Sequence, residues 1–251
     1  MVGGGGGRGP ADRPGPEPVR ALLYFGNSYN FEGALRSGGG SMVDAGETRP
    51  EFDSPAGTAV FGFWRDLVAK GYMPVYSNFF AEATDAFTRG AVAMYLTSAS
   101  GYEGLKKAGF DLRLAPMPTP DGAQRLVPLS TNGFVMLTTD PARQAATCDA
   151  LLSVLTPESV TATVRATATA PLNRVAATGR QYLGGYFAEN PDLVAVNDQP
   201  SFPWYAFPGT GNAEFQTEYL KAQLLVLQGR STPEAALQGL ATTAQRLLDQ
   251  R

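Results

Sequence analysis

The chain contains no histidine among its 251 residues, so it lacks the usual general base of serine and cysteine hydrolases. Histidine is also the commonest zinc ligand, and its absence counts against most zinc sites. Cys148 is the only cysteine, which excludes an intramolecular disulfide. Because Cys148 falls on the apolar side of a helix expected after Asp140, we interpret it as a small buried thiol rather than a reactive one.

Long apolar runs and an excess of one charge are also missing. No stretch of eighteen consecutive apolar residues occurs, so the sequence predicts no membrane-spanning helix. The first eighteen residues are rich in Gly, Pro and charge without the apolar segment of a signal peptide, and residues 1–20 are predicted to be a disordered lead-in. The 20 basic and 23 acidic residues are scattered, which argues against a nucleic-acid partner.

The carboxylates do not suggest an enzyme. No pair has a spacing that fixes the geometry of a glycosidase, and we interpret the individual residues as helix caps or solvated positions. We therefore expect no catalytic residue, no cofactor and no metal site. The carboxylates considered are Asp53, Asp85, Glu103, Asp111 and Asp140.

The first half of the chain carries clear helix and strand signals. Ser54 and Pro55 suit the start of a helix that places Trp64 in the core and stops at Gly71. Phe87 closes the next helix, and Gly90 permits the left-handed residue that ends it. Residues 91–96 then read as a buried strand.

Further helices and strands alternate along the rest of the chain, which favours an α/β fold. A short hairpin is expected around residues 45–46, and the Pro-rich, aromatic segment 199–211 is expected to be a loop. The remaining predicted strands are 112–115 and 132–137. The remaining predicted helices are 104–108, a helix after Asp140 with Ala145, Cys148, Leu151, Leu152 and Leu155 on one face, a helix from Thr156 to near Arg165, and amphipathic helices on Phe215–Leu227 and Ala236–Leu248, the second of them capped at Thr232.

Seven short motifs follow one another with fitting gaps, and together they carry a resemblance to a known family. The motifs are Gly40–Asp44 with Phe52-Asp53-Ser54-Pro55, Phe87-x-x-Gly90-x-x-Ala93-Met94, Ala115–Pro118, Gly133 with Asp140-Pro141, Leu155–Glu158, Ala170–Asn173, and Gly229-x-x-Thr232-Pro233-x-x-Ala236-Leu237. With these motifs, residues 38–250 resemble the C-terminal part of a family 1 extracellular solute-binding protein of a bacterial ABC importer, with the glycerol-3-phosphate and maltose-type binding proteins nearest in pattern.

The resemblance implies a periplasmic-binding-protein type II-like α/β fold, in which two lobes close on a solute. It implies that residues 21–251 are a partial solute-binding domain, with 38–125 and 170–251 mainly in the C-terminal lobe and 130–165 in the N-terminal lobe. The family has a substantial region before the part matched here. A fragment, a misassigned start and half of a split gene are the alternatives, and the strand and helix of 130–165 are expected to lack their sheet partners.

Polar candidates for ligand contact lie at the ends of predicted elements. Ser98 and Ser100 follow strand 91–96, where α/β sheets bind ligands, and the resemblance implies a hydroxyl contact from Ser98. Simple helix capping is the alternative. Thr131 and Asn132 replace glycines of a crossing segment that touches ligand in the glycerol-3-phosphate branch, although a plain strand entry explains them equally. Thr169 falls where that branch has an aromatic hydroxyl.

Aromatic candidates lie in the loop 199–211. Trp204, Tyr205 and Phe207 could offer faces on which sugar rings stack, as an aromatic pair does in maltose-type relatives. Packing of the loop onto its own lobe is the alternative. No arginine occurs between Arg180 and Arg230, so bidentate recognition of a phosphate is not expected.

The resemblance implies the substrate-binding component of an ABC transporter. Such a chain would bind a sugar, a polyol or a glycerophosphodiester-like solute as a monomer and deliver it to the membrane subunits of the permease. Its location would be extracytoplasmic, either periplasmic or membrane-anchored. A sensory or vestigial solute-binding fragment without transport activity is the alternative, and a glycan-active enzyme is a further one.

Overall fold

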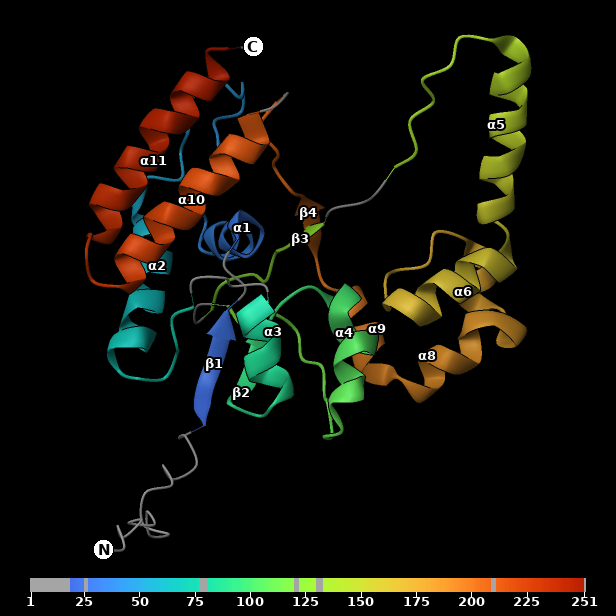
Figure 1. The fold of residues 1–251 in the computed structure, drawn as a ribbon, viewed down its shortest axis with the longest axis horizontal. Coiled ribbons are helices and arrows are strands. Elements are labelled where there is room, and N and C mark those ends of the chain that lie inside the picture. The colour runs from blue at the N-terminus through green and yellow to red at the C-terminus, as the bar shows by residue number, and fades with distance from the viewer. Residues whose placement is uncertain are drawn as a thin grey trace, which may run out of the picture.

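The computed structural model describes residues 19–24, 27–76, 81–119, 122–129, 133–208 and 211–250. It shows a mixed, helix-rich α/β molecule in which a large helical body is joined through two short strands to a smaller helical module and a projecting arm (Figure 1). The body contains α1 (Ser28–Ser37), α2 (Pro55–Ala69), α3 (Ala81–Thr88), α10 (Gly211–Leu227) and α11 (Pro233–Leu248). The module contains α4 (Tyr102–Leu105), α6 (Pro157–Thr167), α7 (Arg174–Thr178), α8 (Gly185–Glu189) and α9 (Pro191–Asn197), and the arm contains α5 (Pro141–Val154).

The strands of the described residues form two parallel pairs. Strand β1 (Arg20–Tyr24) pairs with β2 (Val92–Leu96), and β3 (Val127–Leu129) pairs with β4 (Ser201–Pro203). Parallel pairing requires long crossover connections, and here each connection contains helices. The expected α/β class is therefore confirmed, with two small sheets among the described residues rather than one large one.

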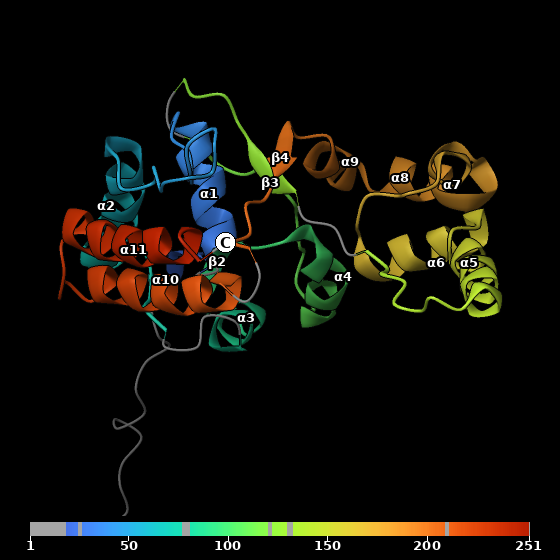
Figure 2. The same cartoon turned by 90° about the horizontal axis from the view of Figure 1, so that it is seen from above.

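The main core lies among α1, α2, α10 and α11, and α10 and α11 run side by side in the view from above (Figure 2). Phe31 and Leu35 of α1 are fully buried at its centre, and the Phe31 ring packs edge-on against Phe61, 5.2 Å between centroids. The predicted core position of Trp64 is confirmed, since its side chain is buried beside the same Phe31 ring. Aromatic packing of this kind adds to the free energy gained by burial alone.

Helix ends were predicted well because their signals are local. Ser54 caps α2 by accepting the Gly57 N–H, and Thr156 and Thr232 cap α6 and α11 in the same way. Gly90 has φ +76° after α3, so the predicted left-handed residue is confirmed.

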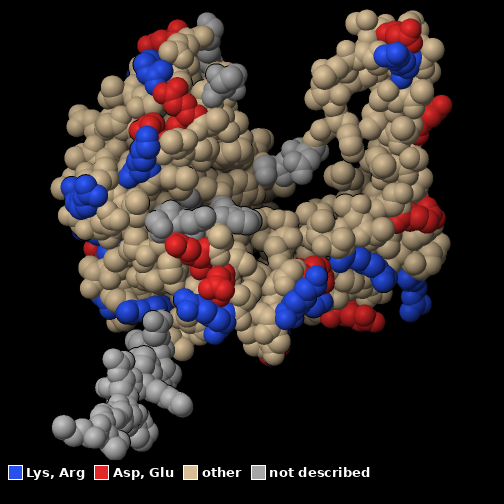
Figure 3. Space-filling model, in the orientation of Figure 1, with Lys and Arg blue, Asp and Glu red and all other residues tan. Residues whose placement is uncertain are grey.

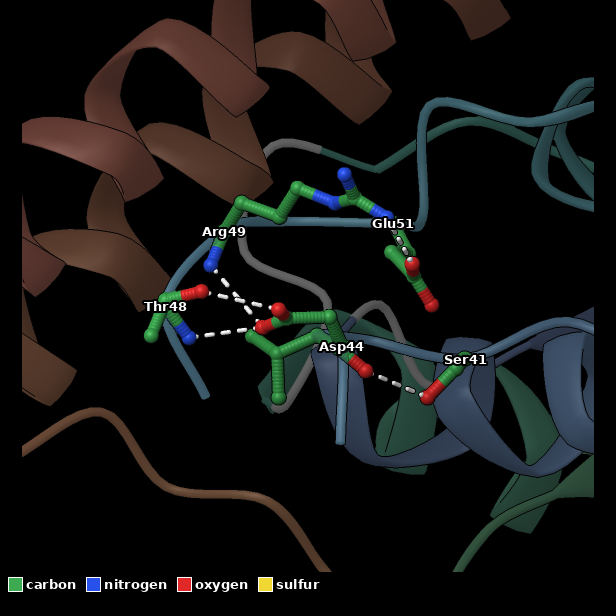
Figure 4. A network of polar contacts seen from close by, with 6 residues as sticks. Ser41, Asp44, Thr48, Arg49 and Glu51 are labelled. Carbon is green, nitrogen blue, oxygen red and sulfur yellow. Dashed lines mark hydrogen bonds and ion pairs between the residues drawn. The ribbon is translucent and has the colours of Figure 1, made fainter. Parts of the chain in front are cut away.

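A short hairpin-like loop is present where one was expected. Val43 and Pro50 form an antiparallel bridge, and Asp44 closes the loop between them (Figure 4). The Asp44 carboxylate accepts the backbone N–H groups of Thr48 and Arg49 at 2.6 and 3.0 Å and the Thr48 hydroxyl at 2.8 Å. These bonds hold the pKa of Asp44 below its usual value. The loop is thereby fixed against α11, where the Gln245 amide donates to the Thr48 carbonyl.

The structure corrects several predicted elements. Residues 112–115 and the described part of 132–137 form neither a strand nor a helix. Strand β2 forms as predicted, but it is only partly buried, and Met94 is 54% exposed. The segment 199–211 contains the short strand β4 within the predicted loop.

The arm is where burial was predicted wrongly. Helix α5 begins at the Asp140 cap as expected, yet none of its residues is buried, and Cys148 is exposed rather than buried. Leu137, just before α5, is 89% exposed. The apolar side of a helix is buried only where a neighbouring surface covers it, and no described element covers this one.

Two glycines of α2 provide a matched test of this packing. A Cβ at Gly57 would overlap the carbonyl oxygen of Phe52, whereas a Cβ at Gly62 would meet nothing within 4 Å. Gly57→Ala should therefore lower the free energy of unfolding by about 1–3 kcal/mol, while Gly62→Ala should raise it by about 0.5–1 kcal/mol. Urea unfolding followed by circular dichroism measures both changes, and equal effects of the two substitutions would contradict the packing of α2.

The exposure of Cys148 is tested by the rate of thiol modification. A maleimide should label the native chain nearly as fast as the chain unfolded in urea, because nothing described shields the sulfur. Strong protection in the native state would show that the α5 surface is covered.

Candidate functional site

The candidate site lies where the body, the module and the β3–β4 pair come together. The space-filling view shows the molecule hollowed between the α10–α11 side of the body and the arm that carries α5 (Figure 3). Strands β3 and β4 lie between these parts in both ribbon views (Figures 1 and 2).

Ser98 and Ser100 follow β2 and form the turn η2 (Ala99–Gly101). The Ser98 oxygen accepts the Ser100 N–H at 3.3 Å, and the two hydroxyl oxygens lie 3.0 Å apart. Ser98 therefore caps the turn η2, which is one of the two interpretations that the sequence allowed. Both side chains are exposed, so the pair also presents hydroxyl groups to solvent.

Thr169 follows the residue that ends α6. Ala168 has φ +53° and is buried against Tyr102 and Leu193. Since Tyr102 directly follows η2, this small cluster brings the Thr169 segment to the same end of the module as Ser98 and Ser100. Thr169 itself is exposed, and its hydroxyl lies 2.8 Å from that of Thr167.

Trp204 and Tyr205 continue from β4. The backbone N–H of Trp204 donates to the backbone carbonyl of Leu129 at 3.0 Å, and this bond extends the pairing between β3 and β4 by one residue. Its half-buried ring lies 6.0 Å from the ring of Tyr29 in α1. Within the described residues, the indole nitrogen of Trp204 is buried without a hydrogen-bond partner. A buried donor without an acceptor costs free energy.

The remaining candidates, Phe207, Thr131 and Asn132, are not accessible side chains within the described residues. Phe207 is 2% exposed, and its ring centroid lies 4.3 Å from that of Phe215, so the loop packs onto the core of the body at this residue. Thr131 and Asn132 lie outside the described residues, shortly after the end of β3 at Leu129.

Sequence reasoning missed helix α1 and the residues it contributes. Glu32 is 0% exposed, and its carboxylate accepts the Tyr205 N–H and the Arg36 guanidinium, each at 3.0 Å. Burial raises the pKa of Glu32, while these two hydrogen bonds lower it in part. The spacing of Tyr29, Glu32 and Arg36, three and four residues apart, was the available signal, since it places all three on one helix face.

Polar contacts hold the module in place beneath the site. Arg113 forms a two-bond ion pair with Asp192 of α9, at 2.7 and 3.2 Å, and this pairing lowers the pKa of Asp192. The Tyr186 hydroxyl of α8 donates to Glu103 of α4 at 3.0 Å. Burial, together with this bond, raises the pKa of Tyr186 to about 12. The segment that follows Ser98 and Ser100 is thus fastened to α8 and α9.

The described residues contain no group of three or more acidic, histidine or cysteine side chains arranged to hold a metal ion. The helices of the described part also include none that is both long enough and apolar enough to cross a membrane.

A family profile for bacterial extracellular solute-binding proteins matches residues 20–193. The match begins earlier than residue 38, where the resemblance in sequence motifs began, and therefore includes β1 and α1. No curated protein matches the chain.

Solved structures of solute receptors share the fold. The chain is similar to the cyclic α-maltosyl-1,6-maltose binding protein of Arthrobacter globiformis, with 19% identity and a TM-score of 0.73, over 93% of this chain and 60% of that one. UgpB of Mycobacterium tuberculosis, solved with glycerophosphocholine, gives 19% identity and 0.73 over 94% and 60%. The GacH receptor of Streptomyces glaucescens gives 19% and 0.70 over 92% and 60%. The chain thus spans about 60% of the length of the structures it matches.

The contact between Tyr186 and Glu103 is tested by the alkaline titration. Between pH 10 and about 12 the unfolded chain loses the phenolic proton of Tyr186 while the folded chain keeps it, so the contribution of this group to stability is lost as pH rises through that window. The difference between absorbance titrations of the native chain and Tyr186→Phe at 295 nm should show a midpoint near 12. Glu103→Gln should lower that midpoint, and an unchanged midpoint would contradict the contact.

Proposed function

The chain belongs to the bacterial extracellular solute-binding proteins, and on that premise we propose that it binds a carbohydrate or polyol-type solute at the hollow beside β3 and β4. Binding is proposed without any chemical step, as befits a family named for solute binding. The proposed location is extracytoplasmic for the same reason.

The observation that carries the carbohydrate assignment is the half-buried Trp204. Its ring lies 6.0 Å from Tyr29, and its indole N–H lacks an acceptor among the described residues. An aromatic face complements the C–H side of a sugar ring, while a free N–H can donate to a sugar hydroxyl. Tyr205, half-buried beside it, is proposed to extend this aromatic surface.

Hydroxyl groups are proposed to complete the described part of the site. Ser98, Ser100 and Thr169 are exposed, and packing around Ala168 and Tyr102 brings their segments to one end of the module. Hydroxyls can both donate to and accept from a sugar, which suits a neutral polyhydroxylated solute. Thr131 and Asn132 are proposed as further contacts from the segment after β3, whereas Phe207 is proposed to support the loop from the core.

A neutral sugar is favoured over a phosphodiester. One structural neighbour was solved with glycerophosphocholine and another is named for binding a maltose-derived oligosaccharide. This chain has no arginine between Arg180 and Arg230, where the loop after β4 and helix α10 lie. Without a guanidinium there, a phosphate would lack its usual bidentate partner.

Delivery to a membrane permease is proposed as the purpose of binding. Receptors of two lobes trap a solute by closing around a hinge, and the closed state differs in surface from the open one. The chain spans about 60% of its structural neighbours, so the site described here is proposed to be one wall of such a cleft. A permease subunit of an ABC importer is the proposed partner.

Calorimetric titration with maltotetraose and with glycerophosphocholine tests this proposal. Maltotetraose should bind, and Trp204→Ala should weaken that binding by about 30-fold, or ~2 kcal/mol, because it removes the central aromatic face. Phe63→Ala, which changes an exposed aromatic residue of α2, is the matched control and should leave the affinity unchanged. Absence of sugar binding, or equal affinities for the native chain and Trp204→Ala, would overturn the assignment.

A further inference from the structure

Side chains of helix α1 bind the segments of β3 and β4 and hold this strand pair against the body. Ser37 accepts the Leu126 N–H and donates to the Leu126 carbonyl, at 3.0 and 3.2 Å. Tyr29, two turns earlier, donates its hydroxyl hydrogen to the carbonyl oxygen of Pro128 in β3. Both ends of α1 are therefore tied to the strand that leads toward the arm.

The same helix face also holds the strand that returns from the module. The Arg36 guanidinium lies 4.7 Å from the centre of the Phe202 ring in β4, and the Tyr29 ring lies against Trp204 just after β4. Between them, Glu32 accepts the Tyr205 N–H. These three α1 residues thus contact three positions of one short segment, 202–205.

The two hydrogen bonds that Glu32 accepts require a carboxylate rather than a neutral amide at this position. One oxygen accepts Arg36 and the other accepts the Tyr205 N–H, so each oxygen has one donor. A neutral amide in the same place has one acceptor oxygen, and its NH₂ group would face a second donor. Since Glu32 is fully buried, water cannot replace the lost acceptor, and a backbone N–H or a guanidinium is left unsatisfied.

We infer that the α1 face of Tyr29, Glu32 and Arg36 is a positioning surface for the solute site, with buried Glu32 setting the orientation of Trp204 and Tyr205. Glu32 acts through the backbone of Tyr205 and does not touch the solute. The identity of the solute rests on the proposed function, but the effect of Glu32 on the Trp204 ring does not. A role in stability alone would leave the environment of that ring unchanged in the folded chain.

The first measurement is spectroscopic and needs no ligand. The chain has two tryptophans, so the emission of Trp204 is obtained by subtracting the spectrum of Trp204→Phe, in which Trp64 alone emits. Glu32→Gln should shift this Trp204 emission and increase its quenching by acrylamide. Tyr29→Phe, which keeps the ring beside Trp204 but loses the bond to Pro128, should give a smaller shift. An unchanged Trp204 signal in folded Glu32→Gln would overturn the inference.

The second measurement is the affinity for maltotetraose. Glu32→Gln should weaken binding about tenfold, the equivalent of one lost buried hydrogen bond. In the Trp204→Ala background the same substitution should have less than a twofold effect, because it acts through the residue already removed. Full additivity of the two effects would contradict a positioning role.

Leu35→Ala is the matched control for a loss of stability. Leu35 is fully buried on the same helix and belongs to the main core cluster. It should lower the stability of the chain while leaving the Trp204 emission and the affinity unchanged. If no sugar binds even to the native chain, the proposed solute is wrong, and the emission of Trp204 alone decides the inference.

Discussion

The burial of α1 is the constraint on which the rest of the structure depends. This helix carries polar residues on several sides, and Ser28, Asn30, Glu32 and Ser37 are buried together with Phe31 and Leu35. Buried polar groups are tolerated only when they are hydrogen-bonded, so each must find a partner in a neighbouring element. Ser28 bonds to Gln216 of α10, Ser37 to Leu126 and Glu32 to Tyr205. The helix is thereby both the centre of the core and the support of the candidate site.

The two sides of the site are held by different interactions. On the body side, the aromatic core beneath Phe207 and the α1 contacts fix Trp204 and Tyr205. On the module side, the Arg113 ion pair and the hydrogen bond from Tyr186 to Glu103 hold the segments around η2. The parallel pair of β3 and β4 lies between these two sides (Figures 1 and 2).

Sequence reasoning recovered the features whose causes are local. The caps at Ser54, Thr156 and Thr232 and the left-handed Gly90 were predicted, because each depends on residues within one turn. Helix α1 was missed because its sequence is polar and contains glycine, and only its neighbours make it buried. Cys148 and Met94 were predicted to be buried because they lie in apolar patterns, but both are exposed because no described neighbour covers them. An apolar pattern shows which side of an element could be covered, but covering it requires a surface from elsewhere.

Some residues of the candidate site could likewise be named from the sequence, and others depend on distant contacts. Ser98, Ser100, Thr169, Trp204 and Tyr205 could be named from their places at the ends of elements, and the structure leaves all five at least partly accessible. Packing of the loop was the stated alternative, but the sequence could not show that Phe207 is the residue that packs, because this depends on contact with Phe215 of α10. The role of Glu32 could be recognised only once helix α1 was identified, because its partner Tyr205 lies 173 positions away in the sequence.

The most direct test of a solute site built around Trp204 is a nuclear magnetic resonance titration of the chain labelled with ¹⁵N-tryptophan. The two indole N–H signals, from Trp64 in the core and Trp204 at the site, are followed as maltotetraose is added. The account predicts that the Trp204 signal shifts with saturation, because its unpartnered N–H gains an acceptor, while the Trp64 signal stays in place. A titration that leaves the Trp204 signal unmoved, or that moves both signals equally, would contradict it.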